Sequence, residues 1–382
     1  MDGIDLTELS KKYEGFYEPL VKVYVDGTDI EEDKKVKMRV TDVSVSITSD
    51  YKASIAEYSL IYAYNVGGGA FRTSDIKKYI SMGTCISIYM GHANKIGEVF
   101  KGFIAGVNFL YNNDSFHDAA IRITAFDVKG IMMANNRSKR LKANYYSDAV
   151  KEILNQQTYQ NLQNNKGISS ITINDTPDKP KEKTGNEQAD NRLEMVAESD
   201  YDFVVKAAKK FNYEFFTIGG HVVFRKAKSD KKEIGTLSPH KAILSYDIGY
   251  DITGVVGEIV VRTLDIGKAS KIEVKKKNNA KYSIGTKAKP LVTNQTYVYV
   301  DSAIESQKDA ENRAAYLLEE TSYRLGSLKL TLKGLPEIFP GKFIVLKGFG
   351  DGASNKFYVT DVEHEYDGHS YTTTIIGKAS TL

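Results

Sequence analysis

The sequence predicts a mainly β protein in which two β-rich blocks flank a smaller module of two helices and a hairpin. Two observations predict this class. The chain has 25 Tyr and 16 Phe but only seven Pro, a composition that suits pleated, half-buried strands. Apolar and polar residues alternate near both ends of the chain, whereas helical spacing dominates the middle. At 382 residues the chain exceeds one hydrophobic core, so we expect two or three domains.

The composition excludes several classes of protein. Apolar residues make up 41% and charged residues 26%, as in a water-soluble globular chain. The 52 basic and 49 acidic residues give a net charge of +3, which predicts no nucleic-acid binding. No segment has the roughly 20 consecutive apolar residues of a membrane span, so we expect no membrane insertion. The N-terminus carries no secretory signal pattern, which predicts synthesis and assembly in the cytoplasm.

The first predicted domain covers residues 1–140 and consists of strands. Leu20–Val25 and Arg39–Ile47 alternate apolar and polar residues, which is typical of half-buried strands. Ala120–Phe126 is expected to return antiparallel to the strand before it. The glycines at 67–69 are not followed by a Gly-Lys-Ser/Thr pattern, so they predict a loop and not a phosphate site.

The second predicted domain, residues 141–235, is the α+β insert. Its second helix opens with a capping-box pattern at Ser199–Asp202 and continues with apolar residues at helical spacing. Tyr213–Ile218 and His221–Arg225 predict a hairpin that turns at Gly219 and Gly220. The polar segment 160–191 is expected to be largely an exposed connection.

The third predicted domain, residues 236–382, is β-rich with one long helix. Ser302 and Glu305 form a capping-box pattern, from which the helix should run to about Glu320. Strands are expected to follow, and the last two should be joined by a two-residue turn at Asp367 and Gly368.

Between residues 266 and 290 lies a lysine-rich run. It contains a single acidic residue, Glu273, and eight lysines, namely Lys268, Lys271, Lys275, Lys276, Lys277, Lys281, Lys287 and Lys289. The local excess of positive charge predicts a mobile solvated loop, with Lys275, Lys276 and Lys277 as a basic contact for an acidic partner.

The two β blocks share an internal echo. Gly83-x-x-Ile86-x-Ile88 is followed by a strand, a turn and a final strand, and so is Gly341-x-x-Ile344-x-Leu346. Two unrelated antiparallel meanders would also produce such a likeness. If the echo is a true repeat, the chain carries two related small β-barrels separated by the α+β insert.

No pattern in the sequence predicts a catalytic, metal or cofactor site. Gly348-x-Gly350-x-Gly352 follows a strand but precedes another strand, so no helix N-terminus is available for a pyrophosphate. His364 and His369 would be diagonal neighbours on the final hairpin without a third ligand, which favours a solvated or interface-facing tip. Cys85 alternates within an apolar strand and predicts an inert, buried thiol.

Three stretches of the chain resemble the phage late control protein D family. These proteins are baseplate hubs of contractile tails, related to the hub part of the valine-glycine repeat G spike proteins of type VI secretion. The stretches are MGTCISIYMG with VFKGFIAGV and ITAFDVKGIMM (82–133), ESDYDFVVKAAKKFNYEFFTIGGHVVFRK (198–226), and DAENRAAYLLEE with LKGLPEIFPGKFIVLKGFG and FYVTDVEHEYDGHSYTTTI (309–375). Their order and spacing are similar to the family's.

The resemblance implies a structural baseplate hub in a phage tail, a phage-tail-like bacteriocin or a related contractile injection machine. It implies a homotrimer whose two tube-attachment barrels per chain form a ring, so that the trimer adapts the hexameric inner tube to the trimeric spike. No needle follows the last strand before Leu382, which implies a separate spike protein. Other baseplate proteins are expected as further partners. The alternative is a cell-wall-binding or peptidoglycan-degrading tail protein.

If two barrels meet their neighbours through free strand edges, two segments are the candidates for contacts with other subunits or with the tube. The candidate interface residues are Ile86, Ile88, Tyr89, Ile344, Leu346 and Lys347.

Overall fold

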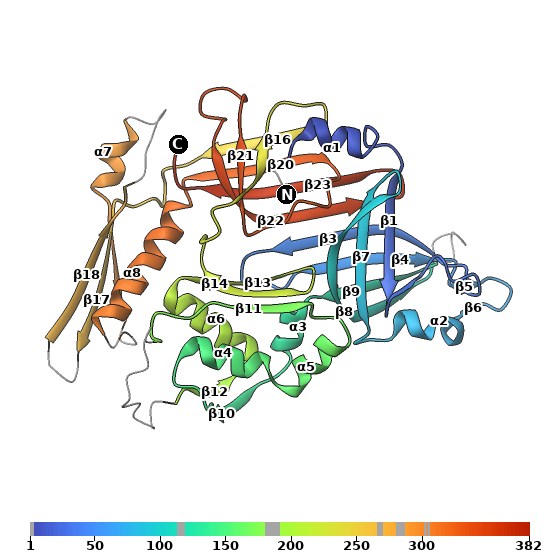
Figure 1. The fold of residues 1–382 in the computed structure, drawn as a ribbon, viewed down its shortest axis with the longest axis horizontal. Helices are drawn as coiled ribbons and strands as arrows, with labels where there is room; N and C mark the ends of the chain where they lie inside the picture. The colour runs from blue at the N-terminus through green and yellow to red at the C-terminus, as the bar shows by residue number, and fades with distance from the viewer. Residues whose placement is uncertain are drawn as a thin grey trace.

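The computed structural model describes residues 4–112, 119–179, 192–265, 270–279, 287–301, 304 and 306–382. In this part of the chain the fold is mainly β. One large sheet fills the middle of the molecule, with a helix-rich module beside it and a smaller sheet with its own helix at one end (Figure 1).

The described residues form a main sheet of thirteen strands, ordered β16-β20-β23-β22-β3-β4-β9-β8-β7-β1-β2, with β21 paired to β22 and β15 paired to β21. The strands are β1 (Pro19–Val25), β2 (Thr28–Asp29), β3 (Arg39–Thr48), β4 (Ile55–Ile61), β7 (Cys85–His92), β8 (Lys95–Leu110), β9 (Ala120–Phe126), β15 (Glu233–Leu237), β16 (Ile243–Tyr250), β20 (Gly326–Lys333), β21 (Phe343–Leu346), β22 (Lys356–Tyr366) and β23 (Tyr371–Ala379).

The prediction of two barrels requires correction, because the two β blocks join into one continuous sheet. β22 of the C-terminal block pairs antiparallel with β3 of the N-terminal block over six residue pairs, from Asp361–Thr48 to Tyr366–Val43. Within the described residues the strand ladder closes into a barrel in neither block. In the N-terminal block the outer strand β3 pairs with β22 of the other block. In the C-terminal block the corresponding strand β16 remains at the edge of the sheet.

Each half of the sheet covers its own core. The predicted alternation is confirmed in β3, where Val43, Val45 and Ile47 are buried in the N-terminal core. A short arm of β5 (Tyr64–Asn65) and β6 (Ala70–Phe71) extends from this half, followed by α2 (Thr73–Ile80). The C-terminal half packs its apolar face against α1 (Leu6–Lys12), whose Leu6 lies in the second core.

The module between the halves contains helices α3 to α6 and two small sheets. Its elements are α3 (Val128–Met133), β10 (Arg137–Arg140), α4 (Tyr146–Leu154), α5 (Gln157–Asn164), β11 (Ser170–Ile173), β12 (Glu194–Glu198), α6 (Asp200–Phe211), β13 (Tyr213–Ile218) and β14 (His221–Lys226). Two predictions are confirmed here. Ser199 and Asp202 form a capping box at the start of α6, and β13 and β14 pair around Gly219 and Gly220.

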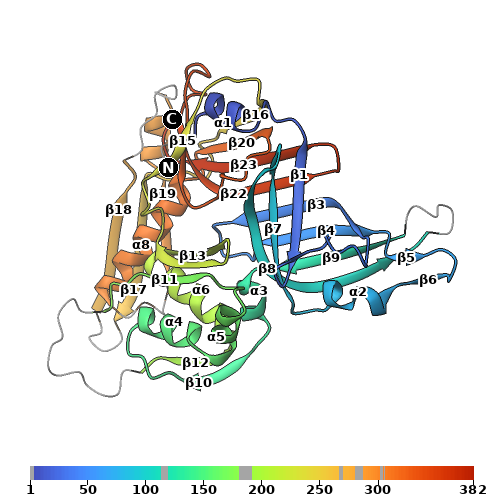
Figure 2. The same cartoon turned by 45° about the vertical axis from the view of Figure 1, so that its right-hand side comes forward.

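A separate three-stranded sheet lies at the end of the molecule where α8 runs alongside it (Figure 2). It consists of β17 (Glu258–Asp265), β18 (Ser270–Lys277) and β19 (Thr296–Val300), with α7 (Ala288–Thr293) and α8 (Gln307–Ser322). The predicted cap residues Ser302 and Glu305 lie outside the described residues. The helix begins at Gln307, because the next Ser-x-x-acid pattern caps it: the Ser306 hydroxyl accepts from the Asp309 N–H at 3.1 Å.

The final hairpin differs from its predicted register. Tyr366 pairs with Tyr371, so the loop has four residues where two were expected. The cause is Asp367, whose carboxylate accepts from the backbone N–H groups of His369 and Ser370 at 2.9 and 2.6 Å and holds the wider turn.

Among the described helices, none combines the length and the apolar character that crossing a membrane requires.

Candidate interaction surfaces

The two halves of the main sheet repeat one strand arrangement. The neighbours β1-β7-β8-β9-β4-β3 of the N-terminal half correspond to β15-β21-β22-β23-β20-β16 of the C-terminal half. The corresponding strands also follow one another in the same order along the chain. One pair differs in direction: β15 is parallel to β21, whereas β1 is antiparallel to β7.

The glycines of the sequence echo occupy equivalent places in this repeat. Gly83 has φ 83° and donates its N–H to the Ile104 carbonyl at 2.7 Å, while Gly341 has φ 85° and donates to the Val359 carbonyl at 2.9 Å. A positive φ favours glycine because a Cβ would clash with the backbone. These two positions therefore require the same residue for the same reason.

A register shift falls at the corresponding position of the strand pair in both halves, directly after the residue whose carbonyl accepts from the glycine. It falls between Ile104 and Gly106 in the β8–β9 pair, and between Val359 and Asp361 in the β22–β23 pair. β8 and β22 thus correspond residue by residue, with numbers that differ by 255.

The junction at β22 has no counterpart within the described chain. The C-terminal half of β22, from Asp361 to Tyr366, pairs with β3. The corresponding part of β8, Gly106–Leu110, is paired on the β9 side only. β16, which corresponds to β3, ends the sheet and pairs with β20 only. Both of these free edges carry exposed apolar side chains, since Phe109 is 47% exposed and Tyr246 is 52% exposed.

Next to the free part of β8 lies an aromatic cluster on the β5–β6 arm, which projects away from the sheet (Figure 2). The Phe109 ring centroid is 5.1 Å from that of Phe71, which in turn lies 5.1 Å from Tyr64. Sequence analysis did not single out either edge. The sequence signal for these edges is that the apolar residues of 107–111 and 243–250 occur on both faces of the strand. In a strand that is buried on one side they would occupy one face only.

The predicted interface residues are mostly core residues, so the prediction of free edges at these strands is wrong. β7 is paired by β1 and β8, and β21 by β15 and β22, which leaves neither strand with a free edge. The buried members are Ile86, Ile88, Ile344 and Leu346. Tyr89, whose hydroxyl donates to Glu98 at 3.0 Å, is half-buried and Lys347 is exposed; their role in an interface stays a prediction.

The lysine-rich run is not a loop where the structure describes it. Lys275, Lys276 and Lys277 lie on β18 and pair with β17, because Ile272 and Val274 bury their side chains against α8 and anchor the strand. Lys275 forms an ion pair with Glu273 at 3.4 Å. Lys268 and Lys281 lie outside the described residues.

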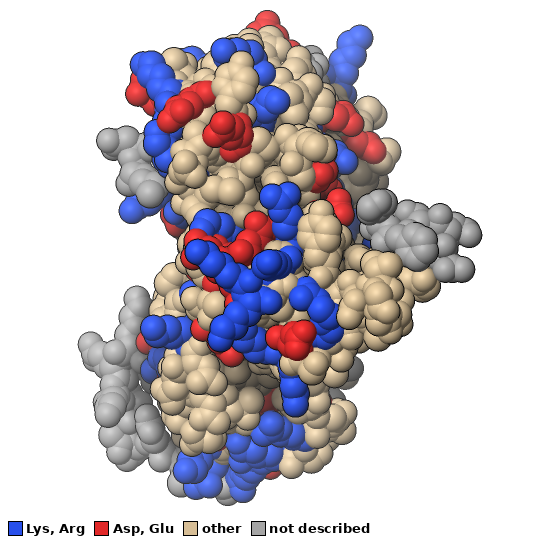
Figure 3. Space-filling view, turned by 90° about the vertical axis from the view of Figure 1, so that its right-hand side faces the viewer, with Lys and Arg blue, Asp and Glu red and all other residues tan. Residues whose placement is uncertain are grey.

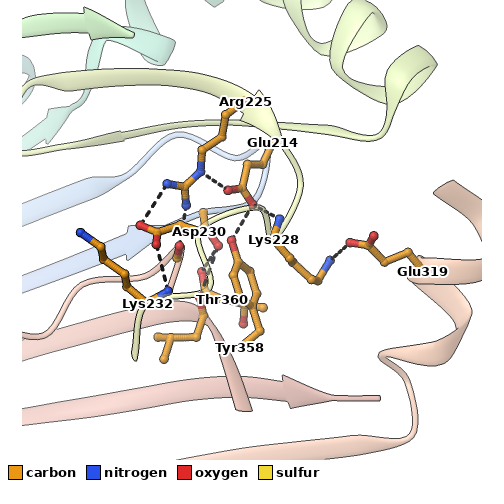
Figure 4. A network of polar contacts seen from close by, with 11 residues as sticks. Glu214, Arg225, Lys228, Asp230, Lys232, Glu319, Tyr358 and Thr360 are labelled. Carbon is orange, nitrogen blue, oxygen red and sulfur yellow. Dashed lines mark hydrogen bonds and ion pairs between the residues drawn. The ribbon is translucent and has the colours of Figure 1, made fainter. Parts of the chain in front are cut away.

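A network of polar side chains joins the insert to the C-terminal half and to α8 (Figure 4). Glu214 of β13 accepts from Arg225 at 2.5 Å and from the Tyr358 hydroxyl on β22. Lys228 donates to Glu319 of α8 at 2.7 Å. Burial and the Glu214 carboxylate raise the pKa of Tyr358 far above its usual value, so its hydroxyl remains a donor.

Four of these residues, Glu214, Lys228, Glu319 and Tyr358, line a cavity of about 360 Å³ between the three parts. The charged side chains of this network have partners on other elements. Arg225, for example, also donates to the Gly341 carbonyl at 2.5 Å and lies 3.5 Å from Asp230. The arrangement fastens the module to the sheet.

A buried lysine fastens the other side of the module. Lys129 of α3 donates to the carbonyls of Asp50 and Lys52, in the loop between β3 and β4, and lies 3.9 Å from Asp127. Asp127 in turn caps α3 and accepts from the Ser54 N–H at 3.1 Å. Burial lowers the pKa of Lys129 and raises that of Asp127.

The residues weighed as chemical candidates lie apart from one another. His364 is fully buried between β3 and β23, contrary to the predicted hairpin tip, whereas His369 is exposed in the turn. Burial raises the pKa of Cys85 to about 11, which disfavours the reactive thiolate. Within the described residues, no three or more His, Cys, Asp or Glu side chains are grouped so that they could hold a metal ion.

On the side of the molecule that faces the viewer in Figure 3, Lys and Arg side chains gather across the middle, with acidic side chains among them. Ion pairs on β1 and α2 join Lys22 to Asp29 at 2.9 Å and Lys78 to Asp33 at 2.8 Å. Such mixed charge is typical of a solvated or polar contact surface and does not form a continuous basic stripe.

The comparisons with known proteins place the fold. The model of the family described as the Alg8 N-terminal domain matches residues 19–367. This family is not the late control protein D family that the sequence resembles. The structural comparisons support that resemblance only as far as a fold shared with tail proteins. No curated protein matches the sequence.

Solved structures of tail proteins are similar over nearly the whole chain. A tail protein from Neisseria meningitidis MC58 has 13% identity and a TM-score of 0.63, covering 95% of this chain and 97% of its own. The 43 kDa tail protein of prophage MuSo2 from Shewanella oneidensis has 10% identity and a TM-score of 0.64, covering 95% and 99%. The E. coli c3393 protein, a component of the type VI secretion system, has 10% identity and a TM-score of 0.53, covering 93% and 76%.

Proposed function

This chain belongs to the Alg8 N-terminal domain family, and we propose that it is a structural baseplate protein of a contractile injection machine, such as a phage tail or a phage-tail-like bacteriocin. The observation that carries this proposal is the fold shared with two tail proteins along nearly the full length of both chains. We propose no enzymatic activity, because the charged side chains of the polar clusters described above pair with one another.

The specific role we propose is that of the hub, a homotrimer that joins the hexameric inner tube to a trimeric spike. The repeat supports it: three chains with two corresponding half-sheets each present six similar units on one side, and remain three-fold elsewhere. The fold also matches a chain in a Francisella PdpA–VgrG complex, at 11% identity and a TM-score of 0.53. The proposed partners are the inner tube protein, a separate spike protein and other baseplate proteins.

We further propose three functional parts, residues 1–140, 141–235 and 236–382, with the insert turned toward the spike. Lys275, Lys276 and Lys277 remain proposed contacts for an acidic partner, because they lie on β18, an outer strand of its small sheet. Assembly would take place in the bacterial cytoplasm, and the final location would be the baseplate of the particle.

The test is the copy number in purified particles. Quantitative mass spectrometry should find three copies per baseplate, and light scattering of the assembled hub should read about 128 kDa, three times the 42.6 kDa chain. Six copies would contradict the hub. Reproducible hydrolysis of purified peptidoglycan by the protein, abolished by one carboxylate substitution, would replace the structural role by the cell-wall alternative.

A further inference from the structure

We propose that copies of this chain join head to tail through a strand pair, in which β16 of one copy lies antiparallel on the free edge of β8, Gly106–Leu110, in the next copy. The proposal rests on the proposed homotrimer for the number of copies alone. The strand pairing itself follows from the repeat within one chain.

The template is the junction between the two halves. There β3 lies on the distal half of β22 with Val45 opposite His364, Ile47 opposite Val362 and Ser44 opposite Glu365. β3 belongs to the N-terminal unit and β22 to the C-terminal unit. The junction therefore uses two different surfaces, one on each unit, and the unused copies of those surfaces are β8 and β16.

The register of the new pair follows from residue rows that cross the sheet. In the C-terminal half one row joins Val359, Gly377, Leu328 and Ile248 across β22, β23, β20 and β16.

The corresponding row of the N-terminal half joins Ile104, Ala125, Ala56 and Val45 across β8, β9, β4 and β3. Ile248 is thus the counterpart of Val45, as Phe109 is of His364 through the offset of 255. Since Val45 faces His364, Ile248 of one copy should face Phe109 of the next.

The chemistry of the resulting pairs is complementary. On one face Ile248 meets Phe109 and Tyr250 meets Val107, so that apolar side chains cover one another, and the 47% exposed Phe109 loses contact with water. On the other face Asp247 meets Leu110, and Gly249 meets Asn108 without steric conflict. The backbone N–H and C=O groups of both free edges gain partners in the same step.

The two surfaces differ from each other, so the contact is heterologous and a ring forms when the rotation closes. Each copy contributes one junction within the chain and one between chains, and both have the same strand pattern. Three copies then carry six like junctions around one ring.

Disulfide trapping tests the register. In a Cys85→Ser background, Asp247→Cys and Leu110→Cys should lie on directly opposite residues, whose Cα atoms are about 4.5–5.5 Å apart in an antiparallel pair, within disulfide reach. Mild oxidation of assembled particles should convert the one-chain band on a non-reducing gel into covalent oligomers that end at three chains, and reduction should restore it.

The matched control carries Asp247→Cys with Ala105→Cys, which is also exposed but five residues, or about 17 Å, out of register. It should remain a one-chain band. A second matched pair, Gly249→Cys with Asn108→Cys, reads the same register if the first pair blocks assembly.

Three copies per particle without a disulfide at either matched pair would overturn the strand pairing and leave the proposed function intact. Disulfide-linked rings that end at another number of chains would support the pairing and overturn the trimer.

Discussion

His364 should make the folded chain sensitive to mild acid. The ring is fully buried on β22 beside the junction with β3, and its Nδ1 lies 2.9 Å from the Tyr371 hydroxyl and 3.0 Å from the Thr373 hydroxyl. The single lone pair of Nδ1 in a neutral ring can accept from one of these two hydroxyls, whereas a charged ring would be desolvated without a carboxylate beside it. Burial accordingly lowers the pKa of His364 from 6.5 to about 3.

The sign and size of the effect follow from linkage. Between pH 6.5 and pH 3 the unfolded chain binds a proton at this residue that the folded chain does not bind, so the free energy of unfolding falls as the pH falls. The slope approaches 1.4 kcal/mol per pH unit, and the loss at pH 4.5 is about 3 kcal/mol. Above pH 6.5 the residue contributes no pH dependence.

The assay is urea unfolding followed by circular dichroism between pH 7.5 and pH 4.5, for the natural chain and for His364→Asn. Asn keeps an acceptor near the position of Nδ1 and cannot be protonated in this range. The variant should start less stable at pH 7.5 because a buried ring is lost, and the gap should shrink by about 3 kcal/mol at pH 4.5. Carboxylates and the buried His92, whose pKa burial also lowers, titrate in both chains and cancel in the difference.

The control is His369→Asn on the same hairpin, whose exposed ring should leave the whole profile unchanged. Parallel pH profiles for the natural chain and His364→Asn would refute the reasoning, because they would mean that the buried ring does not resist protonation.

Three further predictions concern the network, the edge and the basic strand. Tyr358→Phe removes the hydroxyl that donates to Glu214 and should lower the free energy of unfolding by about 1.5–3 kcal/mol. Urea unfolding measures this change, and the control Tyr17→Phe, at a 74% exposed position, should leave the free energy of unfolding nearly unchanged. Leu110→Glu places a carboxylate opposite Asp247 of the next copy and should weaken assembly by about 0.2–1 kcal/mol, whereas Leu110→Lys should not. Native mass spectrometry at low salt compares the two variants, and equal weakening would argue against the register. Replacing Lys275, Lys276 and Lys277 by Glu should reduce particle yield while the melting temperature of the free chain stays nearly constant, and a normal yield would show that these lysines serve solubility alone.

Local features were the part of the fold that sequence could predict. The capping box at Ser199 and the turn at Gly219 and Gly220 depend on residues within a few positions of one another, and both are confirmed. The start of α8 was ambiguous for the same local reason, since Ser302 and Ser306 both begin a Ser-x-x-acid pattern and only the second is the cap seen in the structure.

Long-range pairing could not be predicted in this way. Alternation in β3 shows which face is buried but not that its edge meets β22, more than 300 residues away. The same limit applies to the predicted free edges: Ile86 and Ile344 lie on corresponding strands of the two halves, yet each of those strands is paired on both sides, whereas part of β8 and all of β16 are paired on one side only. A periodic pattern reports side-chain burial, whereas an edge is a property of backbone partners.

The small sheet at the end of the molecule is an excursion from a hairpin. β16 and β20 already pair as far as Tyr250 and Gly326, and the Asp251 N–H donates to the Leu325 carbonyl at 2.9 Å, so residues 252–324 leave and re-enter the fold at one point. The corresponding strands β3 and β4 are joined by residues 49–54 alone. Sequence can therefore be lengthened, exchanged or removed at this point without altering the strand register of the main sheet, and a designer can use the same site to graft a foreign domain.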